Sequence, residues 1–192
     1  MLAGCGVNAI PTKQEKAKAA FADLQSDYQR RSDLIPNLVA TVQANAQQEH
    51  AVLVDVIKAR ASATQVAVDP TKLGDPQTMQ RYQAAQNSLS GALGRLMVVS
   101  EKYPDLKSNE NFLALQSQLE GTENRIAVAR RDYNDAVRDF NTTLRVFPTV
   151  LWAKTMYSSE KPMLMFEATQ TAQTAPTVGF NLGYTSSAPA AK

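Results

Sequence analysis

The sequence is short of the residues that build metal sites and disulfides. It has one cysteine, Cys5, and one histidine, His50, among 192 residues. A disulfide framework needs cysteines in pairs, and structural zinc sites take about four cysteine or histidine ligands. We therefore expect no internal disulfide, no protein-bound metal and no cofactor held through such ligands.

The chain also has no clear excess of one charge and no long hydrophobic run. The chain has 20 Lys and Arg against 18 Asp and Glu, a formal net charge of +2. Nucleic-acid-binding proteins usually carry a clustered basic surface, so this balance predicts no nucleic-acid partner. No stretch approaches the ~18 consecutive apolar residues of a membrane-spanning helix.

The remaining composition indicates a helical, globular chain. Hydrophobic residues make up 44% and charged residues 20%, and a length of 192 residues fits one domain. Only 8 residues are glycine, which disfavours a turn-rich β architecture. We expect three parts: a spacer at 1–12, a helical bundle at 13–167 and an Ala/Thr/Ser/Pro-rich tail at 168–192.

The N-terminus resembles the end of a bacterial lipoprotein signal. Leu2, Ala3 and Gly4 precede Cys5, so that small residues stand before a cysteine whose sulfur would receive the lipid. The charged and apolar regions that such a signal needs are absent. Either Met1 is a late start and Cys5 anchors the protein to a membrane, or the cysteine is inert and the protein stays in the cytoplasm.

Four amphipathic helices are predicted from the hydrophobic periodicity. They cover about 13–31, 34–64, 76–102 and from 108 onward. Ser32 or Asp33 can cap a new helix that Pro36 helps to open, or the first two helices continue through a kink there. The last helix should be about 60 Å long, and its apolar stripe is Leu119, Thr122, Ile126, Ala129, Tyr133, Val137, Phe140, Leu144 and Phe147.

Short connections between amphipathic helices favour an all-α fold, an antiparallel bundle of four long helices. The tail at 168–192 is predicted to be disordered. Alternating apolar residues within it could instead add as a strand to a partner. These residues are Val178, Phe180, Leu182 and Tyr184.

No catalytic constellation is evident in the sequence. A di-iron site in a helical bundle needs paired Glu-x-x-His motifs, but Gln47 stands three residues before His50. Polar residues beside the apolar stripes could form a network that sets the bundle register, pair at the surface, or line a ligand site. The candidates are Asn45, Glu49, Arg60, Arg95, Glu123 and Arg130, with Asn124 and Asn134 beside them.

Several longer runs resemble the LemA family. They are RRSDLIPNLV at 30–39, LSGALGRL at 89–96, EKYPDLKSNENF at 101–112, LEGTENRI at 119–126, RRDYNDAV at 130–137 and FP at 147–148. The resemblance spans about residues 13–180 and implies an antiparallel helical bundle behind an N-terminal membrane anchor. It implies no enzymatic activity, catalytic residue or cofactor.

The resemblance also implies a bacterial cell-envelope location, on the periplasmic or outer side of a membrane. Some relatives are discussed with partners that carry a TPM-type domain. We therefore expect a membrane-anchored scaffold or protein-docking module with Cys5 as the lipid attachment site. The alternative is a carrier for a small apolar ligand or lipid between the helices.

Overall fold

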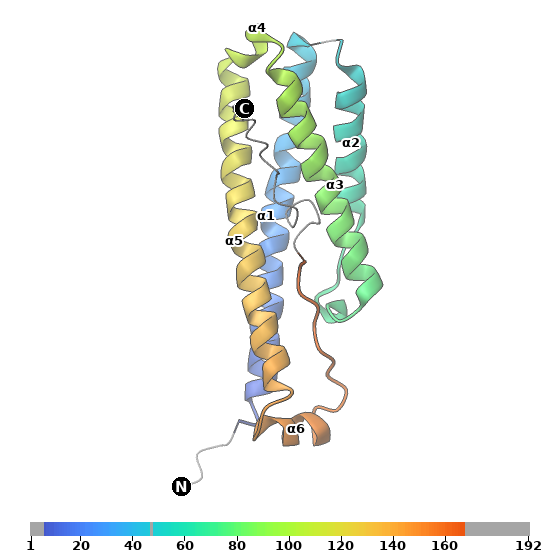
Figure 1. Cartoon of the computed structure of the whole chain (residues 1–192), viewed down its shortest axis with the longest axis vertical. Coiled ribbons are helices and arrows are strands. Elements are labelled where there is room, and N and C mark those ends of the chain that lie inside the picture. Colours follow the sequence, from blue (N-terminus) through green and yellow to red (C-terminus); the bar gives the residue numbers. More distant parts are fainter. Residues whose placement is uncertain (1–5, 47, 168–192) are drawn as a thin grey trace, which may run out of the picture.

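The computed structural model describes residues 6–46 and 48–167, and within them all regular structure is helical. Cys5 and the tail at 168–192 lie outside the described residues. Four helices alternate in direction along the bundle (Figure 1), so the predicted all-α antiparallel bundle is confirmed. The elements are α1 Ala9–Asn45, α2 His50–Gln65, the 3₁₀ helix η1 Pro70–Lys72, α3 Pro76–Ser100, α4 Pro104–Lys107, α5 Glu110–Thr143 and α6 Thr149–Thr155.

Helix α1 continues through Pro36 to Asn45, so the alternative of a continuous helix is confirmed and a new helix capped by Ser32 or Asp33 is wrong. The buried stripe keeps its phase past this point, with Ile35 and Leu38 following Tyr28. Proline lacks the N–H that would bond the carbonyl four residues earlier. Arg60 of α2 supplies that donor instead, because its Nε lies 2.9 Å from the carbonyl oxygen of Ser32.

The core consists of two apolar clusters stacked along the bundle. The cluster towards the end that carries α6 is rich in aromatic residues, and we call it the aromatic cluster. In it the ring centroid of Phe21 lies 5.8 Å from that of Tyr82 and 5.4 Å from that of Tyr133. Towards the end that carries α4, the cluster is aliphatic apart from Phe112 and includes Leu38 and Leu89. Helix α1 pairs closely with α5, and α2 pairs with α3.

The C-terminal end of α5 differs from the prediction. The helix stops at Thr143, and Phe147, assigned to the apolar stripe, is 79% exposed. Proline disfavours a helical conformation for the residue before it, so the helix does not run through Phe147 to Pro148. At ~1.5 Å per residue the 34 residues of α5 span about 51 Å. Helix α6 then lies across the end of the bundle (Figure 1).

Candidate functional site

A buried arginine lies where the two apolar clusters meet. The side chain of Arg31 on α1 is 1% exposed and is among the largest fully buried side chains of the described residues. Its Nη1 donates to Glu123 on α5 at 2.7 Å and to Ser90 on α3 at 2.6 Å. Its Nη2 donates to the side-chain oxygen of Gln86 on α3 at 2.7 Å. We call these four residues the Arg31 node.

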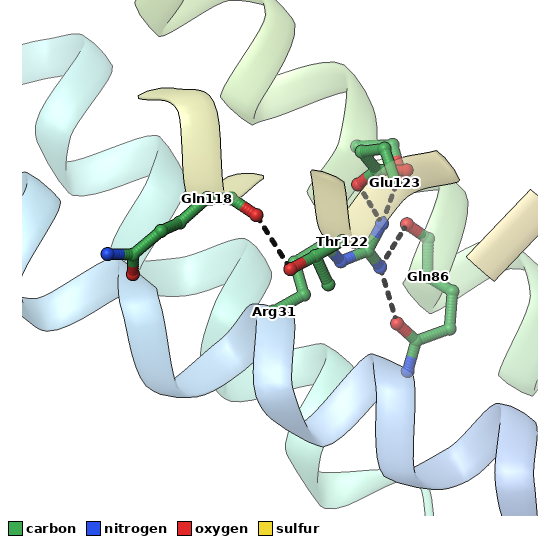
Figure 2. Close-up of polar contacts among 6 residues, drawn as sticks. Arg31, Gln86, Gln118, Thr122 and Glu123 are labelled. Carbon is green, nitrogen blue, oxygen red and sulfur yellow. Dashed lines mark hydrogen bonds and ion pairs between the residues drawn. The ribbon is translucent and has the colours of Figure 1, made fainter. Parts of the chain in front are cut away.

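The Arg31 node ties all four long helices together, and Figure 2 shows the contacts of Arg31 with Gln86 and Glu123. Arg31 reaches α3 and α5 directly, and the Gln86 amide donates to the Ala63 carbonyl of α2 at 3.4 Å. The Arg31 guanidinium also lies 5.1 Å from the Tyr28 ring centre, within cation–π range. A buried charge that is hydrogen-bonded on several sides fixes how the helices meet, because any shift leaves a buried polar atom unpaired.

The node has little room for a ligand. Nε of Arg31 and Oγ of Ser32 are buried and have no hydrogen-bond partner in the described part of the chain. A neighbouring cavity of about 180 Å³ is lined in part by Tyr28, Ser32 and Gln86. Ligand sites usually measure ~300–1,000 Å³. This cavity is therefore smaller than most ligand sites, and the contacts of the node run between helices.

Two of the polar residues singled out in the sequence meet around Arg31. Glu123 pairs with it directly, although its own side chain is 44% exposed. Arg60 bonds the carbonyl of Ser32, the residue that follows Arg31. Both therefore help to hold α1 against its neighbours.

Three others lie elsewhere. Asn45 donates to a carbonyl one turn earlier in its own helix at 2.8 Å. Glu49 accepts a hydrogen bond from the Tyr103 hydroxyl at 2.9 Å, and this bond raises the pKa of Tyr103. Arg95 lies 4.0 Å from Asp55 at an exposed site. The described residues therefore place these three in separate local contacts.

An extended segment, residues 160–167, runs back along the bundle between α3 and α5, and we call it the C-terminal arm (Figure 1). Asn141 bonds both the N–H and the carbonyl of Met163, at 2.9 and 2.8 Å. Asn134 does the same for Phe166, at 2.8 and 3.0 Å. Seven helical residues and three extended residues both span about 10 Å, so the two asparagines match the repeat of the arm.

Other side chains of α3 and α5 also hold the arm. We call Tyr82, Arg130, Tyr133, Asn134 and Asn141 together the seat of the arm. The Tyr133 hydroxyl donates to the Leu164 carbonyl at 2.8 Å. Phe166 packs its ring 5.5 Å from Tyr133 and 6.2 Å from Tyr82. Arg130 covers the Phe166 ring at 5.3 Å and donates to the Glu167 carbonyl at 2.9 Å. Arg130 and Asn134, singled out from the sequence, are therefore part of this seat.

Beyond the arm, the space between α3 and α5 is a groove of about 560 Å³, which we call the upper groove. Its floor is apolar and its rim is polar. Glu123 and Ser90 belong both to its rim and to the Arg31 node. The lining residues are Ser90, Leu93, Gly94, Met97, Gln116, Leu119, Glu120, Glu123 and Asn124.

The clearest pKa shifts among the described residues belong to buried tyrosine hydroxyls. Burial raises the pKa of the hydroxyls of Tyr28, Tyr82 and Tyr133, which lie in the aromatic cluster. No group of three or more His, Cys, Asp or Glu in residues 6–46 and 48–167 is arranged to hold a metal ion. The raised pKa values therefore reflect core packing.

Sequence reasoning missed Arg31, the centre of the node. A signal was present, because Arg31 continues the buried spacing of Leu24, Tyr28, Ile35 and Leu38 on α1. A charged residue at such a position must be paired when it is buried. Gln86 occupies an equivalent position among the buried residues of α3.

Comparison with known proteins assigns the family. The LemA family model matches residues 20–180. Magnetosome protein MamQ of Magnetospirillum gryphiswaldense is 26% identical over 157 residues, which cover 73% of this chain and 58% of that protein. Magnetosome proteins MamQ 1 and MamQ 2 of Paramagnetospirillum magneticum are each 27% identical over the same shares. The chain thus spans less than two thirds of the length of the curated relatives it matches.

These likenesses suggest a membrane-associated protein of the bacterial envelope and assign no molecular activity. In the described part of the chain, none of the helices has the length and hydrophobicity needed to cross a bilayer. The family match covers most of the chain, and the predicted resemblance is confirmed. The chain belongs to the LemA family.

Proposed function

We propose that this chain is a non-enzymatic docking module of the bacterial cell envelope. It binds an extended segment of a partner protein in the upper groove. A lipid on Cys5 holds the module on the periplasmic or outer side of a membrane. The observation that carries the proposal is the C-terminal arm, an extended segment that already lies between α3 and α5.

The arm shows which chemistry this face of the bundle offers to a polypeptide. Asn134 and Asn141 bond main-chain N–H and carbonyl groups, which every peptide presents. Met163 and Phe166 fill the space between the helices. Main-chain hydrogen bonds combined with apolar pockets are a recurrent means of binding an extended peptide.

The upper groove offers the same combination. Leu93, Met97 and Leu119 form an apolar floor, and the amides of Gln116 and Asn124 stand on the α5 rim. From Asn124 to Gln116 the helix rises about 12 Å, the length of roughly four extended residues. The groove therefore fits a short extended motif with small or medium apolar side chains.

The upper groove and the arm occupy separate stretches between α3 and α5. The last described contact of the arm is that of Glu167 with Arg130, and Asn124 lies six residues, about 9 Å, further along α5. A partner with a TPM-type domain is the first candidate to supply the segment. The chain's own residues 168–192 are the competing occupant, and the experiment below separates the two.

A carrier for a small apolar ligand or lipid is the second candidate function. The apolar floor favours it, and a volume of about 560 Å³ is within the usual range of ligand sites. A carrier predicts that the purified full chain releases a lipid on organic extraction. It also predicts that Leu119→Glu abolishes the release, because the substitution places a charge on the floor.

Photo-crosslinking in cells tests the docking proposal. The photoreactive residue replaces Met97 in the upper groove, and in a control it replaces Val128, which is 50% exposed and lines a different cleft. Both are placed in the full chain and in a chain that ends at Glu167. We expect position 97 to give an adduct with one extended segment of an envelope protein in both chains.

Three outcomes would contradict this proposal. They are an adduct only with residues 168–192, an equal adduct from position 128, or no protein adduct at position 97. The first would make the groove the seat of the chain's own tail. Release of a bound lipid together with the third outcome would favour the carrier.

A further inference from the structure

The end of the bundle that carries α6 displays a cluster of exposed apolar side chains. Phe147 is 79% exposed, Met156 63%, Leu151 54% and Val146 46%. We call these four residues the tip patch. Exposed apolar residues that gather at one place usually mark an interaction surface, whereas single ones are common on any protein.

The fold presents this patch outward. Thr149 is buried at the start of α6, and Trp152 and Ala153 pack against the aromatic cluster of the core. One face of α6 therefore holds the helix to the bundle, and Leu151 and Met156 remain exposed. Because α6 lies across the bundle end (Figure 1), a flat surface could meet the patch with the bundle standing upright on it.

The charge of the tip fits an anionic surface. Residues 144–157 contain no Asp or Glu, and Arg145 and Lys154 are both exposed. A segment with exposed apolar side chains and only basic charges is typical of helices that lie in the interface of an anionic bilayer. A binding site for a globular partner usually includes hydrogen-bonding and charged groups of both signs.

The first described residues of the chain lie at the same end of the bundle. A Cβ atom at Gly6 would lie 3.0 Å from Cγ2 of Thr149, so the described start of the chain packs against α6. Cys5, the proposed lipid attachment site, is the next residue towards the N-terminus. A lipid on Cys5 would therefore enter the bilayer at the same end of the bundle as the tip patch.

We propose that the tip patch, with Arg145 and Lys154 beside it, is a membrane-contacting surface that inserts into the interface of an anionic phospholipid bilayer. It acts as a second attachment besides the lipid. It orients the bundle so that the upper groove, which lies away from the α6 end, faces away from the membrane. This inference does not depend on what the groove binds, and the two proposals can fail separately.

Vesicle binding of the full chain tests the proposal. Cys5→Ser keeps the chain unacylated, and the vesicles contain phosphatidylcholine with phosphatidylglycerol, or phosphatidylcholine alone. The chain has one tryptophan, Trp152, which lies in α6 and reports directly on this end. We expect a blue shift of its fluorescence on the anionic vesicles and quenching by lipids brominated on their acyl chains.

A matched pair of variants locates the contact. Phe147→Ser with Leu151→Ser should weaken binding to anionic vesicles by at least about tenfold, because two apolar side chains no longer enter the bilayer. Val98→Ser with Leu113→Ser removes exposed apolar groups from the parts of α3 and α5 near α4, at the opposite end. This control should bind as the parent does. Neutral vesicles should bind the parent about tenfold or more weakly.

Several results would overturn the proposal. They include no binding of the parent to anionic vesicles, equal binding to neutral ones, and equal weakening by the tip and control variants. Self-association of the parent in solution that the tip variant abolishes, without vesicle binding, would assign the patch to a second copy of the chain. Circular dichroism of each variant shows whether the bundle is still folded.

Discussion

Replacing Arg31 by methionine should destabilise the bundle by about 2–4 kcal/mol, because it removes the centre of the Arg31 node. Three hydrogen bonds of 2.6–2.7 Å disappear, to Ser90, Glu123 and Gln86. Gln86 is 5% exposed, so its side-chain oxygen loses its partner while the residue stays buried between the helices. An unpaired buried polar atom costs about 1–3 kcal/mol.

Two effects limit the loss. Glu123 is 44% exposed, so its carboxylate regains water when the guanidinium is gone. The desolvation cost of a buried charge also disappears, and methionine fills much of the space. Arg31→Met combined with Gln86→Leu removes the orphaned side-chain oxygen as well and loses only the long 3.4 Å bond to the Ala63 carbonyl. The double variant should therefore be at least as stable as Arg31→Met alone.

Urea unfolding followed by circular dichroism measures both free energies. Arg95→Met is the matched control, since the pair of Arg95 with Asp55 is exposed on both sides and its loss should cost less than about 1 kcal/mol. A loss below about 1 kcal/mol for Arg31→Met would refute the account of the node. A double variant that is less stable than Arg31→Met would refute it too.

Three further predictions concern other contacts. Arg60→Met should lower the free energy of unfolding by about 1–2 kcal/mol, because the Ser32 carbonyl loses its donor. The loss should be clearly smaller in a Pro36→Ala background, where the N–H of residue 36 bonds that carbonyl. A double-mutant cycle in urea measures the coupling. Asn134→Leu should speed hydrogen exchange of the C-terminal arm, with unchanged exchange contradicting its role in the seat. Lys13 holds the pKa of Asp139 below its usual 3.8 through a hydrogen bond and its charge. The parent should therefore have a higher free energy of unfolding than Asp139→Asn well above pH 3.8, and this difference should disappear as the pH falls through the lowered pKa of Asp139. A difference that does not change with pH would contradict this prediction.

The helices could be predicted where local rules decide them. The predicted start of a helix at residue 76 is confirmed, and Asp75 caps α3 there because its carboxylate accepts the Thr78 N–H. The periodic stripe predicted the buried face of α5 as far as Phe140. These features depend on residues a few positions apart, so the sequence alone contains the information.

The choice between a new helix near Pro36 and a continuous one depends on distant residues, so the sequence left both alternatives open. Pro36 removes one hydrogen bond, and a chain alone gives no reason for the helix to continue. The compensation comes from Arg60, 28 residues beyond Ser32. A proline therefore marks a helix boundary only when no side chain elsewhere replaces the missing donor.

The candidate site was predicted only in part for a similar reason. Asn134 and Arg130 stood out beside the stripe, but their partners are backbone atoms of Phe166 and Glu167, 32 and 37 residues away. A bond to a main-chain group leaves no trace in residue type. The extended arm could therefore not be found by periodicity or motif.

The measurement that tests the central claim most directly is the affinity of the crosslinked partner segment for this bundle. The segment is made as a synthetic peptide and titrated into the full chain, into Leu119→Glu and into Val128→Glu. The account predicts that Leu119→Glu weakens binding at least about tenfold, because a charge replaces an apolar contact, while Val128→Glu binds as the parent does. Equal affinity for all three would show that the upper groove is not where the partner docks.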